Sequence, residues 1–378
     1  MSDHSLTPGL RLARLSLSQF RNYPALVWRP QGCIAVITGA NGTGKTNLLE
    51  AISLLVPGRG LRGARIAELT RRGSSSWAVA GRFDTEAGPM AVGTGTSPDG
   101  SAERRVFRLD GSAPRSQAEL GSRVSAVWLT PQMDRLFQEG ASGRRRFLDR
   151  LVYALEPGHA REVSGHDTAM ASRNRLLSEG RADAAWLAGV EDAMARHGVA
   201  AAAARLALVG QLNAVAPDGA FPPPRLEVLC PVGARLRTGP ALAVEDWLRD
   251  TLAANRGADA ASGSAAVGAH RADLAMQDVA TGLAAAQSST GQQKSLLIGV
   301  VLAHAALLAA VRGFSPMLLL DEPLVHLDAQ RRAALFAALR ALPAQAFLTG
   351  TDNDVFAPLR DAAEMVRIEM DALHPDPG

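Results

Sequence analysis

Short apolar runs and polar turns alternate over the N-terminal part of the chain. From about residue 12 to residue 110 this spacing predicts strands packed around a single helix. Residues 34–38 are rich in β-branched side chains, which is typical of a buried parallel strand, and residues 47–55 carry the apolar spacing of a helix. The pair Asp110-Gly111 indicates a hairpin-type turn near the end of this stretch.

Helical spacing dominates the middle of the chain. A helix and a strand are predicted between residues 114 and 130, and from residue 144 to about residue 214 the sequence is alanine-rich and helical. Breaks are expected at Pro157-Gly158 and near Gly180. Three consecutive prolines at residues 222–224 end this helical region.

The C-terminal part returns to mixed spacing. Residues 225–230 predict a strand and residues 246–255 a helix, followed by a glycine- and serine-rich turn near residues 257–264. The longest apolar stretch, residues 296–311, is short for a membrane span and contains a histidine, so we expect a buried helix. The N-terminus carries no apolar segment of signal-peptide length, and we therefore expect a cytoplasmic protein with no membrane partner.

A glycine-rich loop joins the strand predicted at residues 34–38 to the helix after it. The glycines let successive backbone N–H groups turn toward one anion, and the N-terminus of the following helix adds partial positive charge. Lys45 would supply a mobile charge to the β- and γ-phosphates of ATP, and the Thr46 hydroxyl would be a ligand of Mg²⁺. An ordinary glycine-rich turn is the alternative, but the flanking strand and helix argue against it. The loop consists of Gly39, Ala40, Asn41, Gly42, Thr43, Gly44, Lys45 and Thr46.

Two carboxylates follow a second apolar run. Residues 316–320 predict a fully buried strand, and Asp321 and Glu322 come at its carboxyl end, where an open parallel sheet binds ligands. Asp321 would hold Mg²⁺, directly or through water, and Glu322 would be the general base for the attacking water. An exposed acidic turn before Pro323 is the alternative, and the apolar run leading into it argues against exposure.

Five stretches of the chain together resemble the RecF family, a group of ATP-binding-cassette ATPases related to the structural-maintenance-of-chromosomes proteins. The phosphate loop and the Asp-Glu pair are shared by the whole superfamily. The sequences Phe-Arg-Asn-Tyr at residues 20–23 and Pro-Gly-Arg-Gly at residues 57–60 are narrower signals. The stretches are residues 17–23, 53–62, 144–149 and 268–274 and the signature segment 289–294.

The resemblance implies an α/β fold with a discontinuous ATPase head. We expect residues 1–135 to form its N-terminal part, with the phosphate loop and an antiparallel β subdomain. Residues 136–265 would form a mainly helical arm domain, and residues 266–378 the C-terminal part of the head. The insertion has room only for a short arm, unlike the long heptad-repeat arms of the chromosome-structural ATPases.

The resemblance also implies a homodimer that closes on ATP. In this superfamily the signature segment of one subunit closes over the γ-phosphate that the partner's phosphate loop holds. Ser289, Gly291 and Gln292 match the signature positions. Ser289 offers a hydroxyl, and Gly291 lets the backbone approach the phosphate at the start of the helix that follows.

Four further site residues are implied by resemblance alone. Gln132 matches the glutamine that senses Mg²⁺ and the attacking water, and Asp328 matches the loop that contacts the partner subunit after the base. Arg21 and Asn22 are expected to line the nucleotide pocket.

Two positions depart from the superfamily pattern. Ser288 stands where a leucine normally opens the signature, and Thr351 stands where a switch histidine is expected after the last sheet strand. The second change implies slow hydrolysis. We therefore expect a weak, DNA-stimulated ATPase that acts as a switch.

Composition and charge leave this interpretation in place. The chain of 378 residues is 47% hydrophobic and 20% charged, which is ordinary for a folded protein. Its net charge is only +3, so the distribution of basic residues matters more than their total. The cysteines, Cys33 and Cys230, lie far apart in sequence and are expected to be reduced thiols.

Arginine clusters are the candidate DNA contacts. Arg59 and Arg62 follow the loop helix in a stretch that resembles RecF proteins, and Arg144 and Arg145 begin the predicted arm. Their functional interpretation is sequence-independent contact with DNA phosphates. A solvated surface is the alternative for either cluster, and the second could equally start the arm helix. It could also form ion pairs with Asp149 and Glu156.

The stretch 268–274 holds a basic pair, His270-Arg271. The pair lies just before the signature segment, and in the functional interpretation it approaches nucleotide or DNA. An ion pair with Asp273 is the alternative.

These expectations combine into a leading hypothesis of an ATP-dependent clamp in recombinational DNA repair and replication restart. ATP closes a homodimer on single- and double-stranded DNA at gaps or junctions, and slow hydrolysis releases it. Recombination mediator proteins then promote recombinase loading, a step implied only by resemblance, and the protein would associate with the nucleoid. One alternative is the ATP-hydrolysing subunit of a membrane transporter, against which the helical insertion and Thr351 argue. Another is a nucleotide-switched structural protein without DNA affinity, which the modest net charge leaves open.

Overall fold

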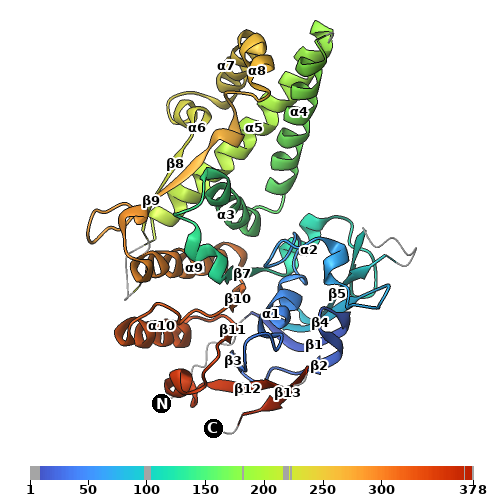
Figure 1. Cartoon of the computed structure of the whole chain (residues 1–378), viewed down its shortest axis with the longest axis vertical. Coiled ribbons are helices and arrows are strands. Elements are labelled where there is room, and N and C mark those ends of the chain that lie inside the picture. Colours follow the sequence, from blue (N-terminus) through green and yellow to red (C-terminus); the bar gives the residue numbers. More distant parts are fainter. Residues whose placement is uncertain are drawn as a thin grey trace. The chain divides into compact units, whose positions relative to one another are not determined.

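The computed structural model describes residues 9–97, 104–180, 183–215, 221, 224–369 and 371–376. The chain forms two compact units (Figure 1). The first includes residues of Met1–Asp134 and Ser289–Gly378, and the second includes residues of Arg135–Ala216 and Pro223–Ser288. The first unit is therefore discontinuous in sequence, with the second unit inserted between its two halves.

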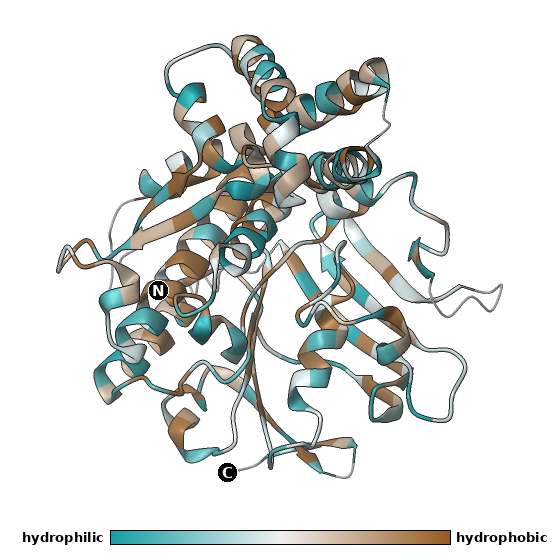
Figure 2. Cartoon of the chain, turned by 45° about the horizontal axis from the view of Figure 1, so that its top comes forward, coloured by the Kyte–Doolittle hydropathy of each residue, from teal (hydrophilic) through white to brown (hydrophobic). Residues whose placement is uncertain are grey.

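The first unit is built on a six-stranded sheet in the order β13-β12-β3-β11-β10-β7. Neighbouring strands run parallel, except that β13 is antiparallel to β12. Strands β3, β11, β10 and β7 are buried along their whole length, as their nearly continuous apolar sequences predict (Figure 2). The strands are β3 Ile34–Thr38, β7 Ala126–Leu129, β10 Met317–Leu320, β11 Ala346–Thr349, β12 Ala363–Glu369 and β13 Ala372–Pro375.

A five-stranded antiparallel sheet in the order β2-β1-β4-β5-β6 also belongs to the first unit and confirms the expected β subdomain. Leu12 of β1 and Phe83 of β4 are fully buried. The turn at Asp110-Gly111 follows β6, and both residues have positive φ angles, 50° and 83°. The strands are β1 Leu10–Phe20, β2 Tyr23–Trp28, β4 Ala78–Thr85, β5 Gly88–Thr96 and β6 Arg105–Leu109.

Helix α9 (Thr290–Arg312) is the apolar helix expected behind the signature segment, and it packs against β7. By length and composition it could cross a membrane, but 61% of its most apolar window is buried inside the protein. We therefore assign it to the core of the first unit. The other helices of this unit are α1 Lys45–Ser53, α2 Gln117–Arg123 and α10 Ala329–Ala341, with 3₁₀ turns η1 Ile66–Leu69, η2 Pro131–Arg135 (which ends at the boundary of the second unit) and η5 Asp354–Leu359.

The second unit is mainly helical, and its long helices α4 and α5 lie side by side (Figure 1). The breaks between α3, α4 and α5 fall at Pro157-Gly158 and after Gly180, as the sequence predicts. A two-stranded antiparallel ribbon of β8 and β9 completes the unit. The elements are α3 Ala141–Leu155, α4 His159–Glu179, α5 Ala184–Asn213, β8 Arg225–Leu229, α6 Pro231–Leu236, α7 Ala241–Ala254, α8 Arg256–Ser262, η3 Ala269–Arg271, β9 Asp273–Gln277 and η4 Ala285–Gln287.

Two features of the second unit differ from the sequence-based expectations. The glycine- and serine-rich turn expected at residues 257–264 is wrong, because helix α8 covers Arg256–Ser262 and only its end is a turn. Residues 266–288, predicted as the start of the C-terminal head segment, group with the second unit, where β9 pairs with β8. Of the prolines expected to end the long helices, Pro222 and Pro223 lie outside the described residues.

Candidate functional site

The glycine loop leaves β3 and turns into α1 at the edge of the sheet where β10 also ends. Gly44 has a φ of 102°, and a Cβ added there would lie 2.6 Å from Asn22 Nδ2 and 2.8 Å from Tyr23 Oη. Tyr23 is fully buried and donates its hydroxyl hydrogen to the Gly44 carbonyl over 3.1 Å. Only glycine therefore fits at this position, where the loop backbone is packed against the start of β2.

Lys45 lies at the mouth of this loop. Its Nζ donates to the carbonyl oxygens of Gly39 (2.7 Å) and Ala40 (2.9 Å), and only 5% of the residue is exposed. Burial lowers the pKa of Lys45, while the charges of Glu322 and Asp321 act in the opposite direction. The ammonium group thus binds two neutral carbonyl oxygens of the loop. A phosphate anion is a stronger acceptor and would replace them.

Asp321 joins the loop helix to the end of β11. Its Oδ1 accepts hydrogen bonds from the hydroxyls of Thr46 (2.9 Å) and Thr349 (2.7 Å), and Asp321 is only 2% exposed. The Thr349 hydroxyl in turn accepts from the backbone N–H of Glu322 over 2.9 Å. These contacts bring Thr46, Asp321 and Glu322 into one cluster, as the sequence predicts.

The sequence-based prediction named Thr351 at the position of the switch histidine and did not name Thr349. Thr351 is exposed, whereas Thr349 is fully buried and contacts both acidic residues. The signal lay in strand register: Leu320 of β10 pairs with Leu348 of β11, so the residue after Leu348 comes beside the residue after Leu320.

Lys294 is the second residue that sequence reasoning left without a role. It is fully buried near the start of α9, and its Nζ donates to Asp134 Oδ2 (3.0 Å) and to the Glu322 carbonyl (3.1 Å). Glu322 has a left-handed φ of 47°, which costs free energy in a non-glycine residue. Gln132 is exposed on the same 3₁₀ turn as Asp134. Lys294 therefore fixes the backbone around two predicted catalytic residues.

The signature residues begin α9 at the surface. Ser289 caps the helix: its Oγ accepts from Gln292 N over 3.4 Å, and Gln292 Oε1 accepts from Ser289 N over 2.9 Å. A Cβ on Gly291 would lie 2.7 Å from the His326 carbonyl, so the segment before Asp328 packs closely on the signature. Asp328 itself caps α10 and accepts from Arg331 N over 2.8 Å.

The donor set at the loop fits Mg²⁺. This ion prefers oxygen ligands and usually takes one or two of them from the protein, with phosphate and water completing its shell. The Thr46 hydroxyl and the Asp321 carboxylate provide such a pair, 2.9 Å apart. Among the described residues no group of three or more His, Cys, Asp or Glu side chains is placed to hold a metal.

Comparison with known proteins identifies the family. A family model described as the RecF/RecN/SMC N terminal domain matches residues 11–373. A protein of Allorhizobium ampelinum named DNA replication and repair protein RecF is 46% identical over 361 residues, which cover 94% of this chain and 96% of the relative. The chain belongs to the RecF family. A RecF of Agrobacterium fabrum is 44% identical and covers 96% of this chain and 98% of its own length.

Solved structures agree with the RecF fold. A structure of the recombination mediator protein RecF-ATPrS in the RecFOR pathway has a TM-score of 0.84 at 22% identity, covering 98% of this chain and 99% of that chain. An Smc head domain from Pyrococcus furiosus, bound to the C-terminal domain of ScpA, has a TM-score of 0.51 at 14% identity, covering 96% and 95%. The head architecture expected from the sequence is thereby confirmed.

The two residues assigned to the nucleotide pocket from the RecF resemblance lie behind the loop. Arg21 donates from Nε and Nη2 to the two carboxylate oxygens of Glu50, each over 2.8 Å. The Asn22 amide contacts the Thr43 carbonyl (3.4 Å) and accepts from the Asn47 side chain (2.7 Å). In this structure their contacts support the loop and α1 from the protein side.

The arginines predicted to contact DNA differ in how they are held. Arg59 is exposed, and Arg62 donates to Asn47 Oδ1 (2.6 Å) and lies 3.3 Å from Glu50 Oε2. Arg144 and Arg145 do lie in the first turns of α3, the alternative that the sequence left open. Arg145 donates to the Ala272 carbonyl over 2.7 Å.

Two aspartates that the sequence offered as alternative ion-pair partners contact other residues. Arg144 makes a two-pronged contact with Asp273, at 2.7 and 2.9 Å, which lowers the pKa of that carboxyl. Asp273 therefore does not pair with His270 or Arg271, which instead contact the Ala265 carbonyl. Asp149 of α3 likewise pairs with Arg205, from which it accepts two hydrogen bonds.

Proposed function

We propose that this chain is an ATP-dependent DNA-binding protein of recombinational repair and replication restart. ATP with Mg²⁺ closes a homodimer on gapped or junction DNA, slow hydrolysis releases it, and recombination mediator proteins act with it. Such a protein would work in the cytoplasm, in association with the nucleoid. The contact of Asp321 with Thr46 is the observation that carries the proposal, because it joins the phosphate loop to the acidic pair in a RecF-family chain.

The residues at the loop have separable roles. Backbone N–H groups of residues 39–46 and the Lys45 ammonium would bind the phosphates, and Thr46 with Asp321 would hold Mg²⁺. Bound Mg²⁺ supplies positive charge that neutralises the phosphate oxygens. Glu322 would accept the proton of the attacking water, and Gln132 would orient that water.

Dimer closure is supported by the exposure of the signature segment. Ser289 and Gly291 lie at the N-terminus of α9, where backbone N–H groups favour an anion, and Ser289 is exposed. A γ-phosphate held by a second subunit would complete this end, and Asp328 on the adjoining loop would contact the partner. The names of the relatives, DNA replication and repair proteins, favour DNA as the bound partner over a transporter.

Glu322→Gln tests the proposal. We expect this variant to bind ATP but to hydrolyse it slowly, so that sedimentation with ATP and Mg²⁺ shows a dimer that carries a fluorescent gapped duplex at low and moderate salt. Lys45→Ala is the control and should neither bind ATP nor dimerise. Dimers that form with ATP but do not bind the duplex would contradict the repair function. Hydrolysis of ATP by Glu322→Gln at the wild-type rate would contradict the assignment of the base.

A further inference from the structure

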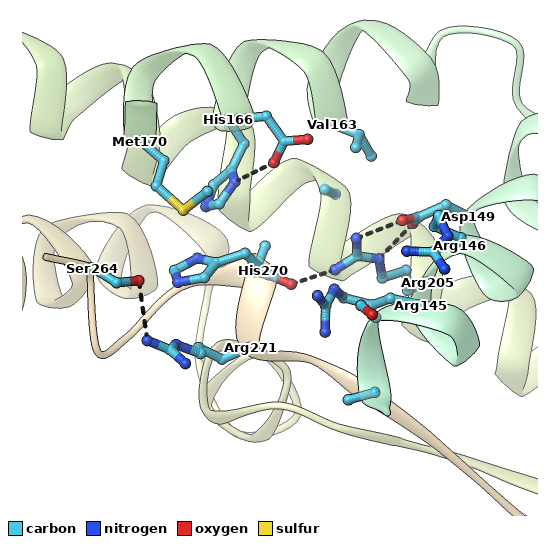
Figure 3. Close-up of a pocket in the computed structure, with 15 residues that line it drawn as sticks. Arg145, Arg146, Asp149, Val163, His166, Met170, Arg205, Ser264, His270 and Arg271 are labelled. Carbon is cyan, nitrogen blue, oxygen red and sulfur yellow. Dashed lines mark hydrogen bonds and ion pairs between the residues drawn. The ribbon is translucent and has the colours of Figure 1, made fainter. Parts of the chain in front are cut away.

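A large cavity in the second unit is lined by residues of α3, α4, α5 and η3. Its volume is about 870 Å³, which is ample for a phosphate group together with the molecule that carries it. Figure 3 shows arginine and histidine side chains gathered around it. The basic residues that line it are Arg145, Arg146, Arg205, Arg271, His166 and His270.

The positive charge of the cavity is only partly compensated. Four arginines and two aspartates line it, so two formal positive charges remain when both histidines are neutral. Asp149 is already used by Arg205, at 2.7 and 2.9 Å, and by His159 Nε2 at 2.8 Å. The other aspartate, Asp167, has a side chain that is 59% exposed, so solvent screens its charge.

Three arginines at the cavity make their hydrogen bonds to neutral groups or are exposed. Arg145 is half-buried, and its Nη1 donates to the neutral Ala272 carbonyl over 2.7 Å. Arg271 donates to the Ala265 carbonyl and to Ser264 Oγ, which are also neutral, and Arg146 is exposed. Burial lowers the pKa of Arg145 and the charge of Arg205 acts in the same direction, whereas the charges of Asp149, Asp273 and Asp167 act in the opposite direction. Guanidinium groups held in this way favour an oxyanion, to which they can donate in pairs.

The histidines add buried ring nitrogens that the described residues leave without a hydrogen bond. The rings of His166 and His270 lie 5.4 Å apart, and His166 is only 2% exposed. His166 Nε2 and His270 Nδ1 are buried without a hydrogen-bond partner among the described residues. Burial lowers the pKa of His270 to about 4, so the ring is neutral at physiological pH. The single N–H of this neutral ring is on Nε2, which donates to the Ala265 carbonyl over 2.9 Å, so His270 Nδ1 can only accept a hydrogen bond. His166 Nε2 can donate to a phosphate oxygen in the tautomer that carries its N–H there.

We propose that this cavity binds a phosphate group, held by Arg145, Arg146 and Arg271 with His166 as a further donor. Two sources share this chemistry: a phosphodiester of a bound DNA strand and a small phosphate-bearing molecule. Only the DNA source rests on the proposed function. A purely structural cluster is a poorer explanation, because it would leave the buried His166 Nε2 without a partner beside arginines whose charge is only partly compensated.

The direct test follows the histidine side chains by NMR. The chain has eight histidines, and substitution of His166 and His270 by Gln assigns their signals. The protein carries Lys45→Ala, so that inorganic phosphate does not bind at the glycine loop. We expect both signals to shift saturably as inorganic phosphate is added. No saturable shift of either signal up to millimolar phosphate would overturn the proposal.

Matched arginine variants locate the effect. Arg146→Gln removes an exposed charge at the cavity, whereas Arg175→Gln removes one from α4 outside it, where the side chain is 67% exposed. We expect Arg146→Gln to weaken phosphate binding several-fold and Arg145→Gln at least about tenfold. Arg145→Lys, which keeps the charge but loses the paired donors, should recover part of the loss. Equal affinities in the Arg146→Gln and Arg175→Gln proteins would overturn the proposal.

A fluorescent gapped duplex, followed by anisotropy with ATP in the Lys45 wild-type background, distinguishes the two sources. Weaker DNA binding by Arg146→Gln than by Arg175→Gln supports a phosphodiester of DNA. Unchanged DNA binding together with the phosphate-induced histidine shifts supports a small phosphate-bearing molecule. If the wild-type protein binds no DNA but the histidines respond to phosphate, the proposed function fails and the phosphate site stands.

Discussion

At the scale of single residues, the hydroxyl of Thr349 connects the predicted metal ligand to the predicted base. It donates to Asp321 Oδ1 over 2.7 Å and accepts from the Glu322 backbone N–H over 2.9 Å. Because Glu322 has a left-handed backbone, this hydrogen bond helps to hold a conformation that the residue would otherwise leave. Thr349 is therefore a positioning residue for both carboxylates.

Replacing Thr349 with Val removes the hydroxyl and keeps the shape. We expect ATP hydrolysis at saturating ATP to slow about tenfold or more, since a hydrogen bond to a charged group and a backbone N–H are both lost. The affinity for ATP should change little, because Lys45 and the glycine loop are untouched. Steady-state hydrolysis and equilibrium nucleotide binding measure the two effects. The exposed Thr351→Val is the control, and equal rates for the two variants would contradict the role of Thr349.

At the scale of elements, α9 is anchored to the acidic pair through Lys294. The fully buried ammonium contacts Asp134, whose side chain is 13% exposed, and the carbonyl of Glu322. Any shift of the start of α9 would therefore displace Glu322, the predicted base, and the 3₁₀ turn that carries Gln132. In the proposed dimer, contact between Ser289 and a γ-phosphate held by the second subunit would thus be linked mechanically to hydrolysis within one subunit.

Lys294→Met tests this link. Alone it leaves Asp134 unpaired, and we expect the free energy of unfolding to fall by ~3–5 kcal/mol. The double variant Lys294→Met/Asp134→Leu should recover most of that stability, because both polar partners are removed together. ATP hydrolysis should still be slower in the double variant than in the wild-type protein, since the Glu322 carbonyl has lost its donor. Denaturant unfolding and ATPase assays separate these results, and a stable double variant with wild-type hydrolysis would refute the link.

The sequence predicted local elements better than long-range partners. The strand at 34–38, the glycine loop and the acidic pair follow from short-range pattern, and the structure forms all three elements. Thr349 could not be chosen over Thr351 without the register of β10 and β11. The sequence offered the nearby Asp149 and Glu156 as alternative ion-pair partners for the Arg144 cluster, but Arg144 pairs with Asp273, 129 residues away along the chain. Such choices depend on packing that local spacing does not encode.

Helix α8 was mistaken for a turn because its stability comes from a buried ion cluster. Arg173 of α4 is fully buried and donates to Glu191 of α5 (2.9 Å) and Asp259 of α8 (2.8 Å). It also donates to the Leu252 carbonyl of α7 over 2.7 Å. One guanidinium group thus joins four helices, and Asp259 fixes α8 despite the glycine and serine residues around it.

Arg173→Met should therefore loosen the second unit without disturbing the first. We expect it to lower the free energy of unfolding by ~3–5 kcal/mol, because the buried Asp259 loses its arginine and the buried Glu191 keeps only Arg256. Arg175→Met, on the same helix but 67% exposed, should change stability by less than ~1 kcal/mol. Hydrogen exchange of α4 and α8 measures local opening, and nucleotide binding reports on the first unit. Faster exchange only at the glycine loop would contradict this account.

At the scale of the whole molecule, DNA affinity has to come from local charge. The net charge is +3 over 378 residues, and many arginines are bound to carboxylates within their own unit. Arg59 differs, because it is exposed on the stretch after α1. Arg62, its companion in the sequence-based prediction, is instead attached to Asn47 and Glu50 of α1. The two arginines should therefore respond differently to substitution.

Arg59→Gln should weaken DNA binding and make its dependence on salt shallower, by about 0.9 in the slope of log K against log salt for one lost phosphate contact on duplex DNA. ATP affinity should be unchanged. Arg62→Gln should alter ATP affinity as well, since its partners lie on the helix that follows the glycine loop. Arg29, exposed at the end of β2, provides the control Arg29→Gln. Anisotropy titrations of a gapped duplex over a range of salt concentrations give the slopes. Equal slopes for Arg59→Gln and Arg29→Gln would remove Arg59 from the DNA interface and leave the arm cavity as the stronger candidate for phosphate contact.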